Sequence, residues 1–186
     1  MGKTKKFALA AVITIIAAQL LYRFYVIPNI LYPTKYSEYV DKYSEEYGLE
    51  KTVVYAVIKA ESGFDAGDRS HTGARGLMQI MPETGEWAAE LIGIEEYDAE
   101  KLYDPETNIH IGCWYLRYLL DMFENNLPTA LAAYNAGLGN VSRWLEGASY
   151  SADGSSLDLI PYKETDGYNE KTMKYIDDYN RYYKEL

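Results

Sequence analysis

Glu61 is the residue of this sequence whose position best suits acid–base chemistry. It ends an apolar run whose spacing predicts a helix over about residues 51–62, and it shares one face of that helix with Val54, Val57 and Ile58. Apolar surroundings and the negative end of a helix dipole both disfavour a carboxylate. We therefore expect Glu61 to hold a proton near neutral pH and to act as a general acid. The alternative is an ordinary glutamate at a helix end that faces water.

A segment rich in glycine and methionine follows Glu61. Residues 73–82 have the sequence Gly-Ala-Arg-Gly-Leu-Met-Gln-Ile-Met-Pro. Gly73 and Gly76 allow tight turns or the close approach of a ligand. If the segment is extended, its Met and Gln side chains alternate between two sides. A connector inside the core, with methionine as adaptable filler, is the competing interpretation.

Two further segments combine polar side chains with breaks in the chain. Residues 132–137, Ala-Ala-Tyr-Asn-Ala-Gly, end a helix with a phenol and an amide beside a glycine. Ile160-Pro161 is followed by Glu164-Thr165 and then by Tyr168. Each segment is unspecific by itself, and the information lies in their order along the chain.

Helices must position these segments, because apolar residues recur at three- and four-residue spacing in most of the chain. Pro and Gly mark several helix starts and ends. The predicted helices span about residues 35–47, 51–62, 82–92, 105–124, 129–136, 141–145 and 170–183, with a polar surface loop at 147–158. No segment alternates with a period of two, so the predicted fold class is all-α.

The N-terminal region predicts export of the rest of the chain. Lysines precede an apolar stretch, residues 7–27, that is long enough to cross a bilayer as a helix. We predict a cytoplasmic N-terminus at 1–6, a transmembrane anchor or signal segment at 7–27, a spacer at 28–34 and one exported domain at 35–186. An uncleaved anchor gives a single-pass protein of the cell membrane with an extracytoplasmic domain. A cleaved signal peptide gives a secreted domain, but large residues stand where a small-residue cleavage site is expected.

Charge and composition exclude several classes of function. The formal net charge is −10, and the first 37 residues contain five basic and no acidic residues, so the remainder carries −15. Such a domain repels nucleic acid. The single cysteine, Cys113, lies in an apolar helical run and predicts a buried, inert thiol. His71 and His110 have no partners at metal-ligand spacing, and no loop has the spacing of a calcium site, so we expect no metal and no cofactor.

Taken in order, the motifs resemble those of the family-1 lytic transglycosylases, the soluble-transglycosylase type with a goose-lysozyme-like catalytic domain. The resemblance covers roughly residues 35–183. It rests on four ordered motifs: Glu61-Ser62-Gly63-Phe64, residues 73–82, Ala133-Tyr134-Asn135-Ala136-Gly137, and Ile160-Pro161 with Glu164-Thr165-x-x-Tyr168. Two departures concern details of the sugar subsites: Asp65-Ala66 stands where the family often has Asn-Pro, and Leu138 stands where it often has proline.

The resemblance implies a lysozyme-like helical fold and a role for seven residues. Glu61 is implied as the catalytic acid and base, and Ser70 as a residue that orients the reacting sugar. Tyr168 is implied to lie near the N-acetyl group of the substrate. The remaining implied substrate-binding residues line the groove: Gln79, Met81, Tyr134 and Asn135.

The implied activity is cleavage of the MurNAc-β-1,4-GlcNAc bond of peptidoglycan, with formation of 1,6-anhydroMurNAc ends. One protein carboxylate suffices for this route, because the N-acetyl group of the substrate replaces the second acid of ordinary glycosidases. A hydrolytic muramidase on the same fold is the alternative, with Asp65 or Asp68 as the nearest second acid in the sequence. A non-catalytic peptidoglycan-binding module is a third interpretation. The implied partner is the glycan strand, with an envelope or secretion machinery as a further candidate, and the N-terminal segment adds the membrane through residues 7–27.

Overall fold

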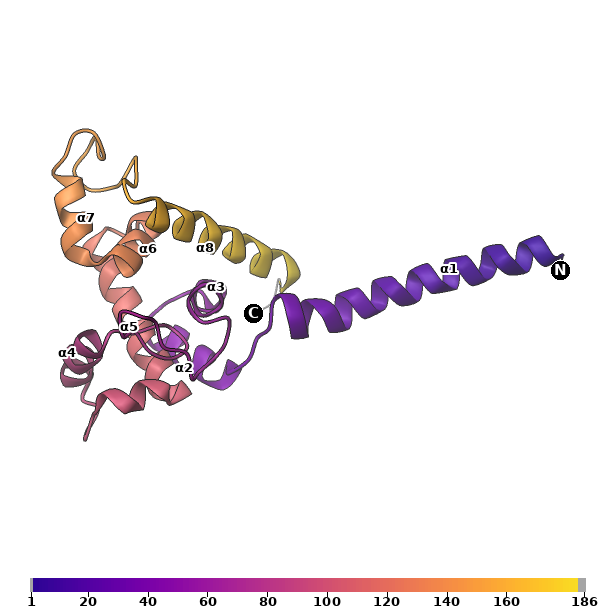
Figure 1. Cartoon of the computed structure of the whole chain (residues 1–186), viewed down its shortest axis with the longest axis horizontal. Helices are drawn as coiled ribbons and strands as arrows, with labels where there is room; N and C mark the ends of the chain where they lie inside the picture. The colour runs from indigo at the N-terminus through magenta and orange to yellow at the C-terminus, as the bar shows by residue number, and fades with distance from the viewer. Residues whose placement is uncertain (1, 184–186) are drawn as a thin grey trace. The chain divides into compact units, whose positions relative to one another are not determined.

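The computed structural model describes residues 2–183, and these residues form helices joined by turns and loops (Figure 1). The all-α prediction is confirmed: the described part of the chain contains isolated β-bridges but no strand. The chain divides between Lys35 and Tyr36 into two compact units. The outer ends of the predicted segments 1–6 and 35–186, at residue 1 and at residues 184–186, lie outside the described residues.

The first unit is a single helical rod. Helix α1 (Lys3–Leu21) continues without a break into a π-helical segment, η1 (Tyr22–Leu31), which contains Pro28. Proline has no N–H for the helix ladder and was expected to end the helix, yet the helix extends four residues into the predicted spacer. Among the described residues this is the one helix long and apolar enough to cross a membrane.

The second unit is built around α3 (Lys51–Glu61), whose residues from Thr52 to Ile58 are all buried. A helix that is apolar on nearly every side must be covered on every side. Helix α8 (Lys163–Tyr182) packs along α3 and also contacts α6 (Leu127–Ala136) (Figure 1). Helix α2 (Ser37–Glu46) packs against both α3 and α5 (Pro105–Met122).

Three shorter elements complete the second unit: α4 (Pro82–Ile92), the 3-10 helix η2 (Ala99–Tyr103) and α7 (Leu138–Leu145). Helix α4 ends at Gly93, whose φ of +73° is the left-handed conformation that favours glycine. Helix α5 starts at the predicted place, because the Asp104 side chain accepts a hydrogen bond from the Thr107 backbone N–H at 2.9 Å.

The prediction was wrong at the start of α8, which begins seven residues before the expected residue 170. The first two turns of this helix carry few apolar residues, so they show no hydrophobic periodicity. The inward side of α8 from residue 165 to residue 172 is formed instead by Thr165, Tyr168, Asn169 and Thr172, which are all buried. These residues have helical spacing, but most of them are polar, so the hydrophobic pattern of the sequence does not indicate a helix here.

Candidate active site

Glu61 is the last residue of α3 and is partly exposed at the edge of the core. The residues one turn before it, Val57 and Ile58, are fully buried. Burial raises the pKa of the Glu61 carboxyl from 4.5 to about 7, while the nearby Tyr168 hydroxyl and the charge of Lys171 oppose the rise. A carboxyl with this pKa is about half protonated at pH 7. The direction of this shift agrees with the expectation that Glu61 holds a proton near neutral pH.

Helix α8 brings a buried phenol, Tyr168, to the Glu61 carboxyl. The Tyr168 hydroxyl makes no hydrogen bond of regular geometry, yet it lies close enough to Glu61 for each group to shift the pKa of the other. Burial, reinforced by the charge of Glu61, raises the pKa of Tyr168 well above 10. The phenol therefore stays protonated at neutral pH and is a donor for the carboxylate form of Glu61.

The chain between α3 and α4 is held in tight turns by its own backbone and by short polar side chains. Ser62 Oγ donates to the Leu77 carbonyl at 2.8 Å, which ties the end of α3 to the glycine-rich segment. Ser70 N donates to the Ala74 carbonyl, and the Ala74 N–H donates back to Ser70 Oγ, both at 2.9 Å. Ser70 Oγ also lies 2.8 Å from Thr72 Oγ1.

Asn108, a fully buried residue of α5, holds the middle of the glycine-rich segment. Its Oδ1 accepts from the Met78 N–H at 2.7 Å, and its Nδ2 donates to the carbonyls of Arg75 at 2.9 Å and Leu102 at 2.8 Å. Gly76 makes room for this arrangement. It has a φ of +74°, and a Cβ there would lie 2.1 Å from the Leu102 oxygen and 2.4 Å from Asn108 Nδ2. Sequence reasoning missed Asn108, although an amide inside the apolar pattern of α5 was a signal for it.

Tyr134 connects α6 to the same segment. Its hydroxyl donates to the Met78 carbonyl at 2.8 Å, and its ring lies 5.5 Å from the ring of Tyr115 on α5. The next residue of the segment, Gln79, has a φ of +48° and donates from Nε2 to the Gly76 carbonyl at 2.9 Å. Hydrogen bonds from α5, from α6 and within the segment thus hold the backbone of residues 76–79 in place.

Two adjoining hollows form a groove across α3, the glycine-rich segment, α6 and α8. One has a volume of about 410 Å³ and is lined by Ala60, Glu61, Asn135, Glu164, Gly167, Tyr168 and Lys171. The other has a volume of about 250 Å³ and is lined by Gln79, Ile80, Met81, Thr84, Tyr115, Tyr134, Asn135, Ala136 and Gly137. Asn135 borders both hollows, so they meet at this residue.

Six of the seven site residues predicted from the sequence line this groove, and they come from four separate segments: Glu61, Gln79, Met81, Tyr134, Asn135 and Tyr168. Ser70 lines neither hollow and lies in the turn that it forms with Ala74. The groove also contains Glu164 and Lys171, which sequence reasoning did not assign to the site. Asp65, the nearest second acid in the sequence, is exposed and caps the Gly67 N–H at 2.9 Å.

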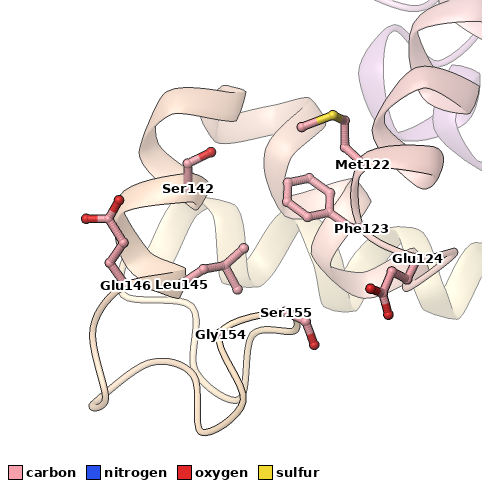
Figure 2. Close-up of a pocket in the computed structure, with 8 residues that line it drawn as sticks. All are labelled: Met122, Phe123, Glu124, Ser142, Leu145, Glu146, Gly154 and Ser155. Atoms are coloured by element: carbon pink, nitrogen blue, oxygen red, sulfur yellow. The ribbon is translucent and has the colours of Figure 1, made fainter.

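A further hollow, with a volume of about 520 Å³, lies between the end of α5, helix α7 and the loop at residues 154–155 (Figure 2). Its apolar lining includes Met122, Phe123 and Leu145, and its two carboxylates, Glu124 and Glu146, lie on opposite sides. None of the residues predicted for the site lines it. Its carboxylates do not converge on a common point, so it does not provide the acid–base chemistry of the Glu61 groove.

The described residues contain no group of three His, Cys, Asp or Glu side chains that could hold a metal ion. Cys113 is buried, and burial raises the pKa of its thiol, which disfavours the reactive thiolate.

Residues 38–155 match the family described as "Transglycosylase SLT domain". This match covers more than half of the chain. The chain belongs to the transglycosylase SLT family. The family expected from the sequence motifs is thereby confirmed.

Named relatives in the transglycosylase SLT family agree with this assignment. The chain is 36% identical over 154 residues to the soluble lytic murein transglycosylase of Escherichia coli K12. The aligned region covers 82% of this chain and 24% of that protein. It is 30% identical over 138 residues to the membrane-bound lytic murein transglycosylase C of Actinobacillus pleuropneumoniae, covering 68% of this chain and 37% of the relative.

Solved structures of SLT-family proteins have the same fold as this chain. An inactive variant of the lytic transglycosylase Slt from Pseudomonas aeruginosa matches with a TM-score of 0.73 and 30% identity, over 83% of this chain and 25% of the other. The 70-kDa soluble lytic transglycosylase in complex with bulgecin A matches with a TM-score of 0.73 and 34% identity, over 83% of this chain and 25% of that one. The lysozyme-like helical fold expected from the motifs is confirmed, and the chain spans about a quarter of the length of these relatives.

Proposed function

We propose that this protein is a peptidoglycan lytic transglycosylase that cleaves the MurNAc-β-1,4-GlcNAc bond and leaves 1,6-anhydroMurNAc ends. The observation that carries the proposal is the position of Glu61, a carboxyl with a pKa of about 7 in the wall of a groove. Membership of the SLT family and the names of the relatives support the same reaction.

In the proposed mechanism Glu61 acts first as an acid and then as a base. The protonated carboxyl donates to the glycosidic oxygen as the bond from this oxygen to C1 of MurNAc breaks. The N-acetyl carbonyl oxygen of the same sugar attacks C1 from the opposite face and forms an oxazolinium-type intermediate. The Glu61 carboxylate then accepts the proton of the C6 hydroxyl, whose oxygen attacks C1, closes the 1,6-anhydro ring and releases the N-acetyl group. A pKa near neutrality suits both steps, because each protonation state is accessible.

The other groove residues would bind and orient the glycan strand in this scheme. Tyr168 would face the N-acetyl group, which must be aligned for attack on C1. Tyr134 and Asn135 would bind the strand together with Gln79 and Met81 of the glycine-rich segment. Ser70 lines neither hollow, so its proposed role in orienting the reacting sugar requires the strand to extend beyond them.

A hydrolytic muramidase is the second candidate, and the position of Glu164 favours it. This second carboxylate lines the same hollow as Glu61. A general base that activates water on the far face of the sugar would turn the same groove into a hydrolase. The number of carboxylates in the groove therefore does not distinguish the two reactions, but the products of the reaction do.

Product analysis of purified peptidoglycan digests tests the proposal. The full-length protein in mild detergent is expected to release muropeptides with anhydro ends, and mass spectrometry separates these from reducing ends, which carry one additional water. Glu61→Gln is expected to abolish release, whereas Glu164→Gln is expected to leave the anhydro character of the products unchanged. Reducing ends that disappear in Glu164→Gln would establish the hydrolase instead. Binding of strands without release of any fragment would indicate a non-catalytic module.

We also propose that the helix Lys3–Leu31 anchors the protein in the cell membrane as a single span, with the lysine-rich end in the cytoplasm and the catalytic domain outside. The length and apolar composition of the helix support this topology. The names of the relatives include both soluble and membrane-bound proteins. Membrane fractionation tests the proposal, since a cleaved signal segment would leave a soluble mature domain with a new N-terminus.

A further inference from the structure

Three ammonium groups cluster at the end of the groove that contains Glu61. Lys171 of α8 lines the hollow itself, Lys174 follows one turn later on α8, and Lys59 lies two residues before Glu61 on α3. The pKa of Lys59 is lowered first by burial and then by the charges of Lys171 and Lys174, so both ammonium groups lie close enough to act on Lys59.

This cluster is unusual for the domain that carries it. Residues 38–186 have a formal charge of −15, so dispersed lysines would find favourable partners almost anywhere. Placing like charges together costs free energy. Lys174 is partly neutralised by an ion pair with Asp178 on the same helix. Of the residues that line the hollow, Lys171 is the one cation.

Lys171 is held in place at the edge of the hollow. Its Nζ donates to the carbonyl of Ala60 at 3.0 Å, at the C-terminal end of α3, and lies 5.7 Å from the centre of the Tyr168 ring. An ammonium has three N–H donors, and the Ala60 carbonyl takes one of them. The side chain is exposed, so the remaining donors can reach a ligand in the hollow. An ammonium that is already held by a hydrogen bond loses little further conformational entropy when it binds an anion.

We propose that Lys171, supported by Lys59 and Lys174, forms an anion subsite that binds a carboxylate of a muramic acid residue at the Glu61 end of the groove. This inference rests on the proposed function, because it takes the glycan strand of peptidoglycan as the ligand. The carboxylate has two sources in such a strand. One is the lactyl group, which is free when no peptide is attached, and the other is the acidic peptide that the lactyl group carries.

Binding of defined strands to the full-length protein in mild detergent tests the subsite. All measurements use the Glu61→Gln background, so that no strand is cleaved. The probes are strands with their peptides and strands freed of peptide by an amidase, each also with every carboxyl converted to an amide. Lys171→Gln is compared with Arg181→Gln, which removes one exposed positive charge further along the same helix, and with Lys171→Arg, which keeps the charge.

Lys171→Gln is expected to weaken binding of the charged strands about fivefold to tenfold at low salt, with the loss shrinking as the salt concentration rises. Arg181→Gln and Lys171→Arg are expected to bind nearly as the parent does, and the amidated strands are expected to show no effect of Lys171→Gln. A loss confined to peptide-bearing strands assigns the subsite to the peptide, and a loss confined to peptide-free strands assigns it to the lactyl group.

The subsite is refuted if Lys171→Gln weakens charged and amidated strands equally, if it matches Arg181→Gln, or if it has no effect. These results leave the proposed function standing, because that depends on anhydro products from the parent protein and on their loss in Glu61→Gln. The two proposals therefore fail in different measurements.

Discussion

Replacing Glu61 with Gln is expected to stabilise the folded protein at alkaline pH and to have much less effect in acid. The carboxyl loses its proton near pH 4.5 when unfolded and near pH 7 when folded. Between these values the folded state binds more protons than the unfolded state, so the stability of the wild type falls as pH rises. The difference between the two pKa values corresponds to about 3 kcal/mol above pH 7, and to about 2 kcal/mol after allowance for the exposed part of the side chain.

Urea unfolding of the full-length protein in mild detergent at pH 4 and pH 8.5 measures this effect. The free energy of unfolding of Glu61→Gln minus that of the wild type should be about 2 kcal/mol larger at pH 8.5 than at pH 4, so the variant gains stability relative to the wild type as pH rises. Glu90→Gln provides the matched control, because Glu90 is an exposed glutamate on α4. Its effect should be nearly the same at both pH values. If Glu61→Gln changes the free energy of unfolding by the same amount at pH 4 and at pH 8.5, the carboxyl is not desolvated in the folded protein. The acid–base assignment then loses its physical basis.

Two further predictions concern the groove and the turn beside it. The kcat/KM of the wild type is expected to fall as pH rises through about 7. Tyr168→Phe should shift this fall to higher pH, because the Tyr168 hydroxyl lowers the pKa of Glu61. A fall at the same or a lower pH would contradict the contact between Tyr168 and Glu61. Gly76→Ala should destabilise the protein by more than about 2 kcal/mol, because its φ is positive and its Cβ would meet the Leu102 carbonyl. The control is Gly139→Ala, where no atom lies within 4 Å of the new Cβ, so a similar loss there would refute the steric argument.

The part of the site that lies on regular helices was predictable from the sequence. The phase of Glu61 follows from the apolar residues that precede it by three and four positions, since a helix places these on one face. That phase turns the carboxyl toward the apolar face of α3. The all-α class follows from the same periodicity, and the starts of α4 and α5 follow from Pro82 and Pro105.

The part that depends on contacts between distant segments was not predictable. Asn108 satisfies three backbone groups in two distant segments, at Arg75 and Met78 and at Leu102, and an amide in an apolar pattern does not show which groups it will meet. Glu164 and Lys171 enter the Glu61 hollow only because α8 packs along α3. A one-dimensional search for a second acid therefore turned to Asp65, the neighbour in sequence, rather than to Glu164, the neighbour in space.

The proton affinity of Glu61 is a property of the contact between α3 and α8 rather than of α3 alone. Tyr168 and Lys171 are three residues apart on α8, so they lie on one side of that helix and approach the carboxyl together. Displacing α8 would admit water to Glu61, which lowers its pKa, and would also remove two groups that oppose the rise. A pKa near 7 thus depends on a fixed distance between the helices.

Two polar bonds tie the start of α8 to its neighbours. Asn169 Nδ2 donates to the Pro128 carbonyl at the beginning of α6, at 2.6 Å, and Lys171 Nζ donates to the Ala60 carbonyl of α3 at 3.0 Å. Directional bonds restrict the register and rotation of a helix more narrowly than apolar packing does, because an unmet buried donor is costly. Asn169, a polar residue of the inward side that hides the start of α8 from hydrophobic periodicity, therefore works with Lys171 to position α8 beside Glu61.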